Sequence, residues 1–112
     1  MINSPADLLA RLIVLFPEFG RYWESPGNYF RNDDGGPAFC GVFAEFSHFF
    51  REWFESLPDD RVRDFAKLLS ECMSAPTALD EAAATCFLEN VSGEPCSQPL
   101  GKHLFGRARE FF

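Results

Sequence analysis

The sequence has few basic residues. Ten Lys and Arg stand against 17 Asp and Glu, so the 112-residue chain carries a formal net charge of −7. No Lys or Arg occurs between Lys67 and Lys102. Binding to nucleic-acid phosphates or to an anionic membrane surface needs a basic surface, so we expect no nucleic acid and no membrane as partner. An acidic surface can attract a basic protein, although it also serves solubility alone.

The sequence also lacks a long apolar run. LLARLIVLF near the N-terminus is interrupted by Arg11 and followed by Pro17, and no basic segment precedes it as in a secretory signal. No stretch approaches the roughly 20 apolar residues of a membrane span. These absences predict a cytoplasmic protein, in which cysteine thiols stay reduced.

The four cysteines are far apart in the sequence, at positions 40, 72, 86 and 96. Their spacing matches no zinc-ligand pattern. Cys40, Cys72 and Cys86 lie on or beside apolar faces of expected helices, and we interpret them as small buried hydrophobic residues.

Groups for catalysis or metal binding are scarce. Glu45 and His48 match the Glu-x-x-His spacing of di-iron helical bundles, but that chemistry needs a second such pair. The only other histidine is His103, and the residue three positions before it is Leu100. No nucleophile–base motif and no phosphate-binding glycine loop is present. We therefore expect no metal, no cofactor and no enzymatic activity.

Phenylalanine is abundant, with 14 in the chain, and six of them lie in residues 39–57, FCGVFAEFSHFFREWFESL. Apolar side chains recur there at steps of four, three, four, three and four, as on one face of a helix. This stripe consists of Phe39, Phe43, Phe46, Phe50, Trp53 and Leu57. Phe49 and Phe54 flank it, and must be covered by the first two helices, by the loop 25–37 or by a partner.

Proline and capping residues divide the chain into helices, and no segment alternates as a strand does. The expected helices span residues 5–16, 18–24, 37–57, 58–73, 77–90 and 102–111, with loops at 25–37 and 92–101. Short joints around Pro58 and Pro76 force antiparallel neighbours. We predict an all-α fold, in which residues 1–112 form one compact bundle of five to six helices. Antiparallel HEAT-like hairpins would surround the central aromatic helix.

The chain contains several short motifs: Leu8-Leu9, Phe16-Pro17-Glu18-Phe19, Trp23, the aromatic segment 39–54 and Phe87-Leu88-Glu89-Asn90. Together these motifs resemble a family of small, all-helical bacterial proteins of unknown function. The motifs cover most of the chain and consist mainly of core residues. Such proteins look like the acidic immunity proteins that accompany secreted bacterial toxins. The resemblance implies a helical fold and, by analogy, toxin neutralisation; it implies no catalytic residues.

Our first functional hypothesis is a non-catalytic protein-binding module, which neutralises a toxin by occluding it. Acidic side chains and an aromatic anchor would face a basic cleft of the partner. The 13-residue loop 25–37 is long for a passive connection, which makes its acidic pair a candidate. The candidate partner-binding residues are Asp33 and Asp34 in this loop, and Glu45, His48, Glu52 and Glu55 on the outer face of the central helix.

Two alternatives remain open at this point. A small enzyme or ligand-binding protein would have its site in a pocket between helices, using His48 or His103 with a carboxylate. A homodimer would bury surplus phenylalanine rings at its interface.

Overall fold

Helices begin where the sequence places proline and capping side chains. The computed structural model describes residues 2–24 and 38–110. The Ser4 hydroxyl accepts a hydrogen bond from the Asp7 backbone N–H at 3.2 Å, which caps α1 (Pro5–Leu15). Pro17 stands at the first position of α2 (Pro17–Trp23), where its missing N–H costs no hydrogen bond. The other segments are α3 (Phe39–Trp53), the 3-10 helix η1 (Phe54–Ser56), α4 (Asp59–Cys72), α5 (Ala78–Ala82), the π-helix η2 (Ala83–Leu88), α6 (Glu89–Val91), α7 (Ser97–Gly101) and α8 (Gly106–Glu110).

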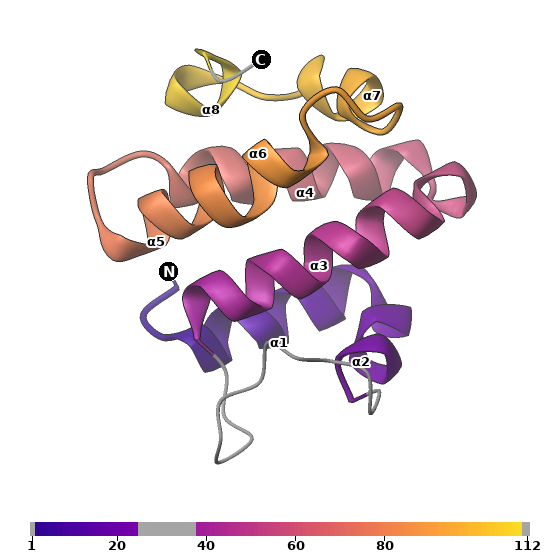
Figure 1. The fold of residues 1–112 in the computed structure, drawn as a ribbon, viewed down its shortest axis with the longest axis horizontal. Helices are drawn as coiled ribbons and strands as arrows, with labels where there is room; N and C mark the ends of the chain where they lie inside the picture. The colour runs from indigo at the N-terminus through magenta and orange to yellow at the C-terminus, as the bar shows by residue number, and fades with distance from the viewer. Residues whose placement is uncertain (1, 25–37, 111–112) are drawn as a thin grey trace.

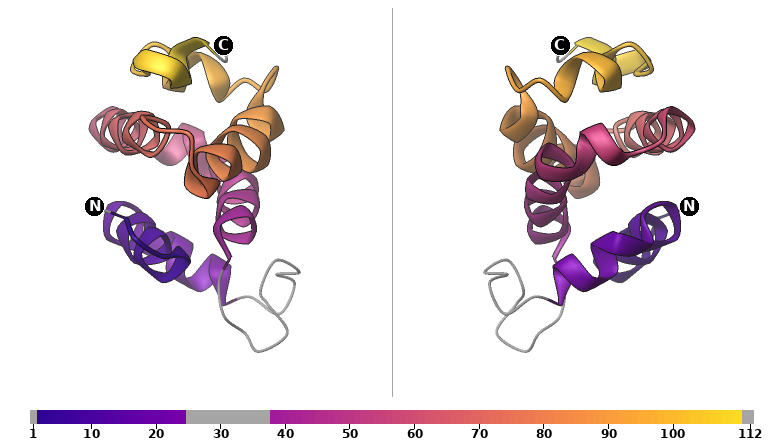
Figure 2. Two further views of the ribbon diagram at one scale, coloured as in Figure 1. Left: turned by 90° about the vertical axis from the view of Figure 1, so that its left-hand side faces the viewer. Right: turned by 90° about the vertical axis from the view of Figure 1, so that its right-hand side faces the viewer.

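These helices form a bundle around α3. Helix α4 runs opposite to α3, and the continuous run from α5 through η2 to α6 turns back again (Figure 1). The views in Figure 2 place α1 and α4 on one side and α3 with the α5–α6 run on the other. Helices α7 and α8 pack against α4, on the side of the bundle opposite α1 and α2 (Figure 1). The described residues contain no strand. The prediction of an all-α bundle with antiparallel hairpins is confirmed.

The core is a cluster of phenylalanine rings centred on Phe46. Its ring centroid lies 4.9 Å from that of Phe19 in α2 and 4.8 Å from that of Phe65 in α4. It lies 5.4 Å from Phe16 between α1 and α2, and 5.9 Å from Phe87 in η2. These separations fall in the favourable range for aromatic pairs. One side chain of α3 therefore connects most of the bundle.

The first two helices cover Phe49, one of the two rings that flank the stripe. Its ring lies 5.5 Å from Phe19 and 5.6 Å from Tyr22, both in α2, and it is fully buried. Phe54, the other flanking ring, is half-buried and packs against the core. Short helix α2 thus supplies the cover that the aromatic helix needs at this end.

Three predicted boundaries were wrong. Helix α3 ends at Trp53 and continues as one 3-10 turn rather than reaching residue 57. Residues 97–101, expected in a loop, form α7, which packs against α4. The last expected helix shrinks to α8, because residues 102–105 form the turn that connects it to α7. The differences in α3 and α8 lie at helix ends, where periodicity carries little information, whereas α7 is a short helix that the sequence pattern did not predict.

The helix expected at 77–90 spans residues 78–91 and has a π-helical middle. Thr77 begins it with a side-chain cap, since its hydroxyl accepts a hydrogen bond from the Asp80 N–H. A π-turn widens the helix and places successive side chains differently from an α-turn. Phe87 and Leu88, neighbours in the sequence, are both fully buried here. This segment packs against α3 along most of its length.

A disulfide joins Cys40 in the first turn of α3 to Cys86 in η2, with the Cα atoms 5.4 Å apart. Our interpretation of these two residues as reduced, buried side chains was therefore wrong: Cys40 is exposed and Cys86 is half-buried. The interpretation is correct for Cys72, which is a buried thiol, as is Cys96. Burial raises the pKa of Cys72 to about 12 and that of Cys96 to about 11, so both thiols stay protonated at neutral pH.

Candidate functional site

An open groove lies between α2 and the last turns of α3. It arises because Pro17 starts α2 directly after α1, so that α2 packs across the C-terminal half of α3. The groove has a volume of about 640 Å³. It is lined by Pro17, Glu18, Arg21, Tyr22, Phe49 and Trp53. Apolar and aromatic side chains thus meet charged ones at a solvent-open surface.

Three aromatic rings follow one another along the groove. Trp53 stacks on Phe49 with centroids 6.0 Å apart and ring planes 16° apart. Phe49 in turn meets Tyr22 edge to face at 5.6 Å. Phe49 is fully buried, whereas Trp53 is 41% exposed. Trp53 was predicted as part of the buried stripe, but it is the last residue of α3, where its neighbours in the bundle no longer enclose it.

The hydroxyl of Tyr22 connects the groove to an acidic side chain of α3. It donates a hydrogen bond to Oε2 of Glu52 at 3.1 Å. Burial is the main reason that the pKa of Tyr22 rises to about 12, and the hydrogen bond to Glu52 and the negative charges of Glu52 and Glu45 raise it further. Nearby Arg51 opposes this shift. At neutral pH, Tyr22 therefore keeps its proton and donates a hydrogen bond to the Glu52 carboxylate.

This raised pKa predicts a change of stability at alkaline pH. In the folded protein Tyr22 keeps its proton up to about pH 12, whereas in the unfolded chain it loses the proton near its ordinary pKa of 10. The stabilisation is complete below pH 10 and declines as the pH rises toward 12. We expect Tyr22→Phe to remove this decline. Absorbance of tyrosinate against pH, compared between wild type and Tyr22→Phe, should yield a difference curve with a midpoint near 12. A midpoint near 10 would contradict the assigned environment.

Glu45 was predicted on the exposed face of the central helix, and this is wrong. Its side chain is buried, with a relative exposure of 5%. Residues 42–47 are all buried, so this part of α3 has no solvent-facing side. Neighbours on two sides explain this: α1 and α2 contact one flank of α3, and α5, η2 and α6 contact the other. Desolvation raises the pKa of the Glu45 carboxyl.

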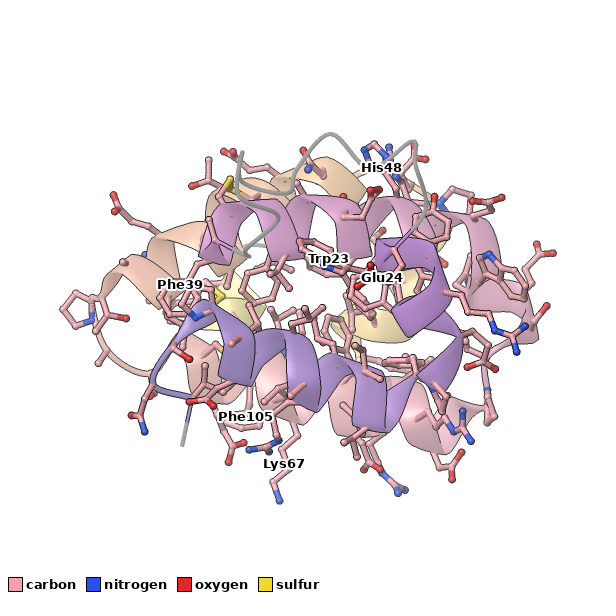
Figure 3. All side chains as sticks on the ribbon, turned by 90° about the horizontal axis from the view of Figure 1, so that it is seen from below. Trp23, Glu24, Phe39, His48, Lys67 and Phe105 are labelled. Carbon is pink, nitrogen blue, oxygen red and sulfur yellow. A yellow bond between two sulfur atoms is a disulfide. The ribbon has the colours of Figure 1, made fainter. Side chains whose placement is uncertain are left out.

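The remaining candidates are exposed or lie outside the described residues. Asp33 and Asp34 belong to the latter group. His48 is exposed on the outer side of α3, far from Lys67 on the opposite edge of the molecule (Figure 3). Partial desolvation and the charge of Arg51 lower the His48 pKa. Glu52 is exposed and bound to Tyr22.

Glu55 is exposed in η1, which directly follows α3. The predicted partner-binding residues therefore do not all lie together at one site. Glu52 is the member that lies next to the groove through its bond to Tyr22. Sequence reasoning missed the groove itself. Trp53 had been assigned to the apolar face of the central helix, and the available signal was its position in the last turn before the break at Pro58.

A second cavity, of about 390 Å³, lies between the end of α4 and α8. Asp80 is buried beside it and accepts a hydrogen bond from Nε of Arg107 at 2.9 Å. That hydrogen bond raises the already high pKa of Arg107. The Phe105 backbone N–H donates to the Ser70 hydroxyl at 3.2 Å. These contacts attach α8 to α4 and α5. They also give the side chains of Ser70, Asp80 and Arg107 hydrogen-bond partners within the protein.

Neither histidine lines either cavity. His103 instead lies beside α4, with Nε2 3.6 Å from Oδ1 of Asp59. Across residues 2–24 and 38–110, no group of three or more His, Cys, Asp or Glu side chains is placed to hold a metal ion. The residues that line the groove supply aromatic faces, the carboxylate of Glu18 and the guanidinium of Arg21.

Comparisons with models of known protein families, with characterised proteins and with solved structures found no match to this chain. No helix within the described ranges is long and apolar enough to cross a membrane. The fold and the groove define a small all-helical protein with an open aromatic surface site.

Proposed function

We propose that this protein is a non-catalytic binding module that docks a protein partner with a basic surface through the groove between α2 and α3. The observation that carries this proposal is Trp53, a large ring that is 41% exposed in a groove beside Tyr22. Tryptophan and tyrosine are the residues most enriched among binding hot spots, and exposed apolar patches mark interaction sites. The excess of acidic residues, with a net charge of −7, favours a basic partner.

Neutralisation of a bacterial toxin by occlusion is the biological role that we propose for this binding. It rests on the resemblance of the sequence motifs to a family of small helical bacterial proteins of unknown function, and on the analogy between such proteins and toxin-immunity proteins. An immunity protein needs no catalytic group, since it acts by covering the toxin's working surface. An exposed aromatic anchor, Trp53, together with exposed acidic side chains such as Glu52 and Glu55, suits a toxin whose surface is basic.

Small-molecule binding is the second candidate. The groove volume of about 640 Å³ lies within the range of ligand pockets. Against this role, the groove is open, and neither histidine proposed for catalysis lines it. A homodimer formed through the groove is a third outcome, which sedimentation at high protein concentration would reveal.

Affinity capture with matched variants tests the protein-binding function. Immobilised wild type, Trp53→Ala and Val14→Ala would be exposed to lysate of the native source. Val14 is an exposed side chain on α1, which makes its replacement a control for general surface effects. We expect a partner that binds wild type and Val14→Ala but is lost, by at least tenfold, with Trp53→Ala. Capture of the same partner by all three would place binding on another face, and capture of none would refute the function.

We also propose that the protein works in an oxidising compartment rather than in the cytoplasm expected from the sequence. Disulfides form and persist in secreted and periplasmic proteins and are rare in the cytosol. The Cys40–Cys86 disulfide supports this location. Alkylation of free thiols in intact producing cells, followed by mass analysis, tests it. Labelling of Cys40 and Cys86 in the cell would refute it, because the bond would then be reduced there.

A further inference from the structure

We propose that the groove between α2 and α3 accepts an arginine side chain of the partner. The guanidinium would stack on Trp53 and pair with the carboxylates of Glu18 and Glu52. This inference rests on the proposed protein-binding function and names the chemistry of the segment that docks. Its three supports are an available ring face, a positioned carboxylate and the charge of the groove.

The first support is the orientation of Trp53. One face of its indole stacks on Phe49 at 6.0 Å with nearly parallel planes. Since the side chain is 41% exposed, a part of the indole that Phe49 does not cover is in contact with solvent. A cation placed over an indole face is attracted by the ring's π-electrons, and tryptophan is the strongest such partner. Guanidinium is planar and weakly hydrated, so it stacks better than an ammonium group.

The second support is the carboxylate of Glu52. Its Oε2 accepts the Tyr22 hydroxyl at 3.1 Å, which restrains a long side chain that would otherwise be mobile. A carboxylate has two oxygens and about four lone-pair sites, so this single hydrogen bond leaves acceptors for another donor. Arginine carries five N–H donors that fit carboxylates in a bidentate manner. Restraint before binding reduces the entropy lost on binding.

The third support is charge. Glu18 lines the groove and Glu52 borders it, while Arg21 is the one cation among the lining residues. These three groups sum to one negative charge, within a chain of net charge −7. An incoming cation is therefore favoured, and Arg21 is the side chain that competes with it. Replacing Arg21 by Gln should strengthen binding of an arginine probe, which sets this proposal apart from docking of an apolar segment.

The test is an NMR titration with the peptide acetyl-Gly-Arg-Gly-amide, using the citrulline peptide as a neutral isostere. We expect the arginine peptide to shift the Trp53 indole and Tyr22 ring signals, with a dissociation constant on the order of millimolar. Trp53→Ala should weaken binding about fivefold or more. Arg21→Gln should strengthen it, and Val14→Ala should leave it unchanged.

Glu18→Gln is a second variant, because an exposed side chain at the start of α2 can change without loss of the core. It too should weaken binding. Equal shifts with the citrulline peptide, or no shift with the arginine peptide at saturating concentration, would overturn the arginine inference. If affinity capture finds a Trp53-dependent partner while the arginine peptide fails, the binding function stands without this chemistry. If the peptide binds and no partner is captured, the groove chemistry stands and the protein-binding function fails.

Discussion

Replacement of Phe46 by alanine is expected to lower the free energy of unfolding by about 3–5 kcal/mol, the usual cost of deleting a buried phenylalanine. Phe46 is fully buried and its ring contacts rings from α2, α4 and η2. The cavity left behind cannot close by moving one helix alone, since different elements surround it. Domains of this size are stable by roughly 5–15 kcal/mol, so the loss is a large share of the total. Urea unfolding followed by far-UV circular dichroism measures it.

Phe105→Ala is the matched control for this substitution. It deletes the same ring, but Phe105 is 50% exposed, and its hydrogen bond to Ser70 is made by the backbone N–H, which the substitution keeps. A surface change of this kind should alter stability by about 0.5 kcal/mol or slightly more. Similar losses for both variants would mean that Phe46 does not hold the central position that its ring contacts indicate.

Reduction of the Cys40–Cys86 disulfide is expected to lower stability by about 2–4 kcal/mol. The bonded residues are 46 positions apart, so the bond restricts a long loop of the unfolded chain. The Cys40→Ser, Cys86→Ser double variant should show the same loss without any reductant. Its unfolding midpoint should not respond to reductant, whereas the wild-type midpoint should fall.

Thiol counting provides the control for that experiment. Under denaturing conditions, alkylation without reductant should label two of the four cysteines, and reduction should make all four reactive. Cys72 and Cys96 are buried thiols with raised pKa, so they should not exchange with the bond in the folded protein. An unchanged midpoint after proven reduction would contradict a stabilising role for the disulfide.

Local patterns in the sequence predicted much of the fold. Prolines and capping side chains act within one helical turn, so helix starts at Pro5, Pro17 and Thr77 could be inferred from neighbouring residues. The spacing of Phe43, Phe46 and Phe50 identified the buried face of α3, because helical periodicity reports burial when one face is covered.

Features that depend on two distant segments were not predictable in this way. The disulfide joins residues of α3 and η2 that come close only after the chain folds, and cysteine spacing carries no such information. Glu45 was misplaced because a periodic pattern assumes one covered face, whereas α3 is covered on two flanks at this level. The groove was missed because it needs Tyr22 of α2 and Trp53 of α3 together.

The disulfide also affects how the molecule responds to mechanical force. It closes a covalent ring that contains α3, α4 and α5, while α1, α2, α7 and α8 lie outside it. When the two ends are pulled, tension passes through the sulfur atoms and bypasses the 46-residue span between them. The extended chain is then shorter by about 150 Å than after reduction. Single-molecule stretching would therefore unravel the outer helices, while Phe46 and Phe65 stay within the segment that the disulfide closes.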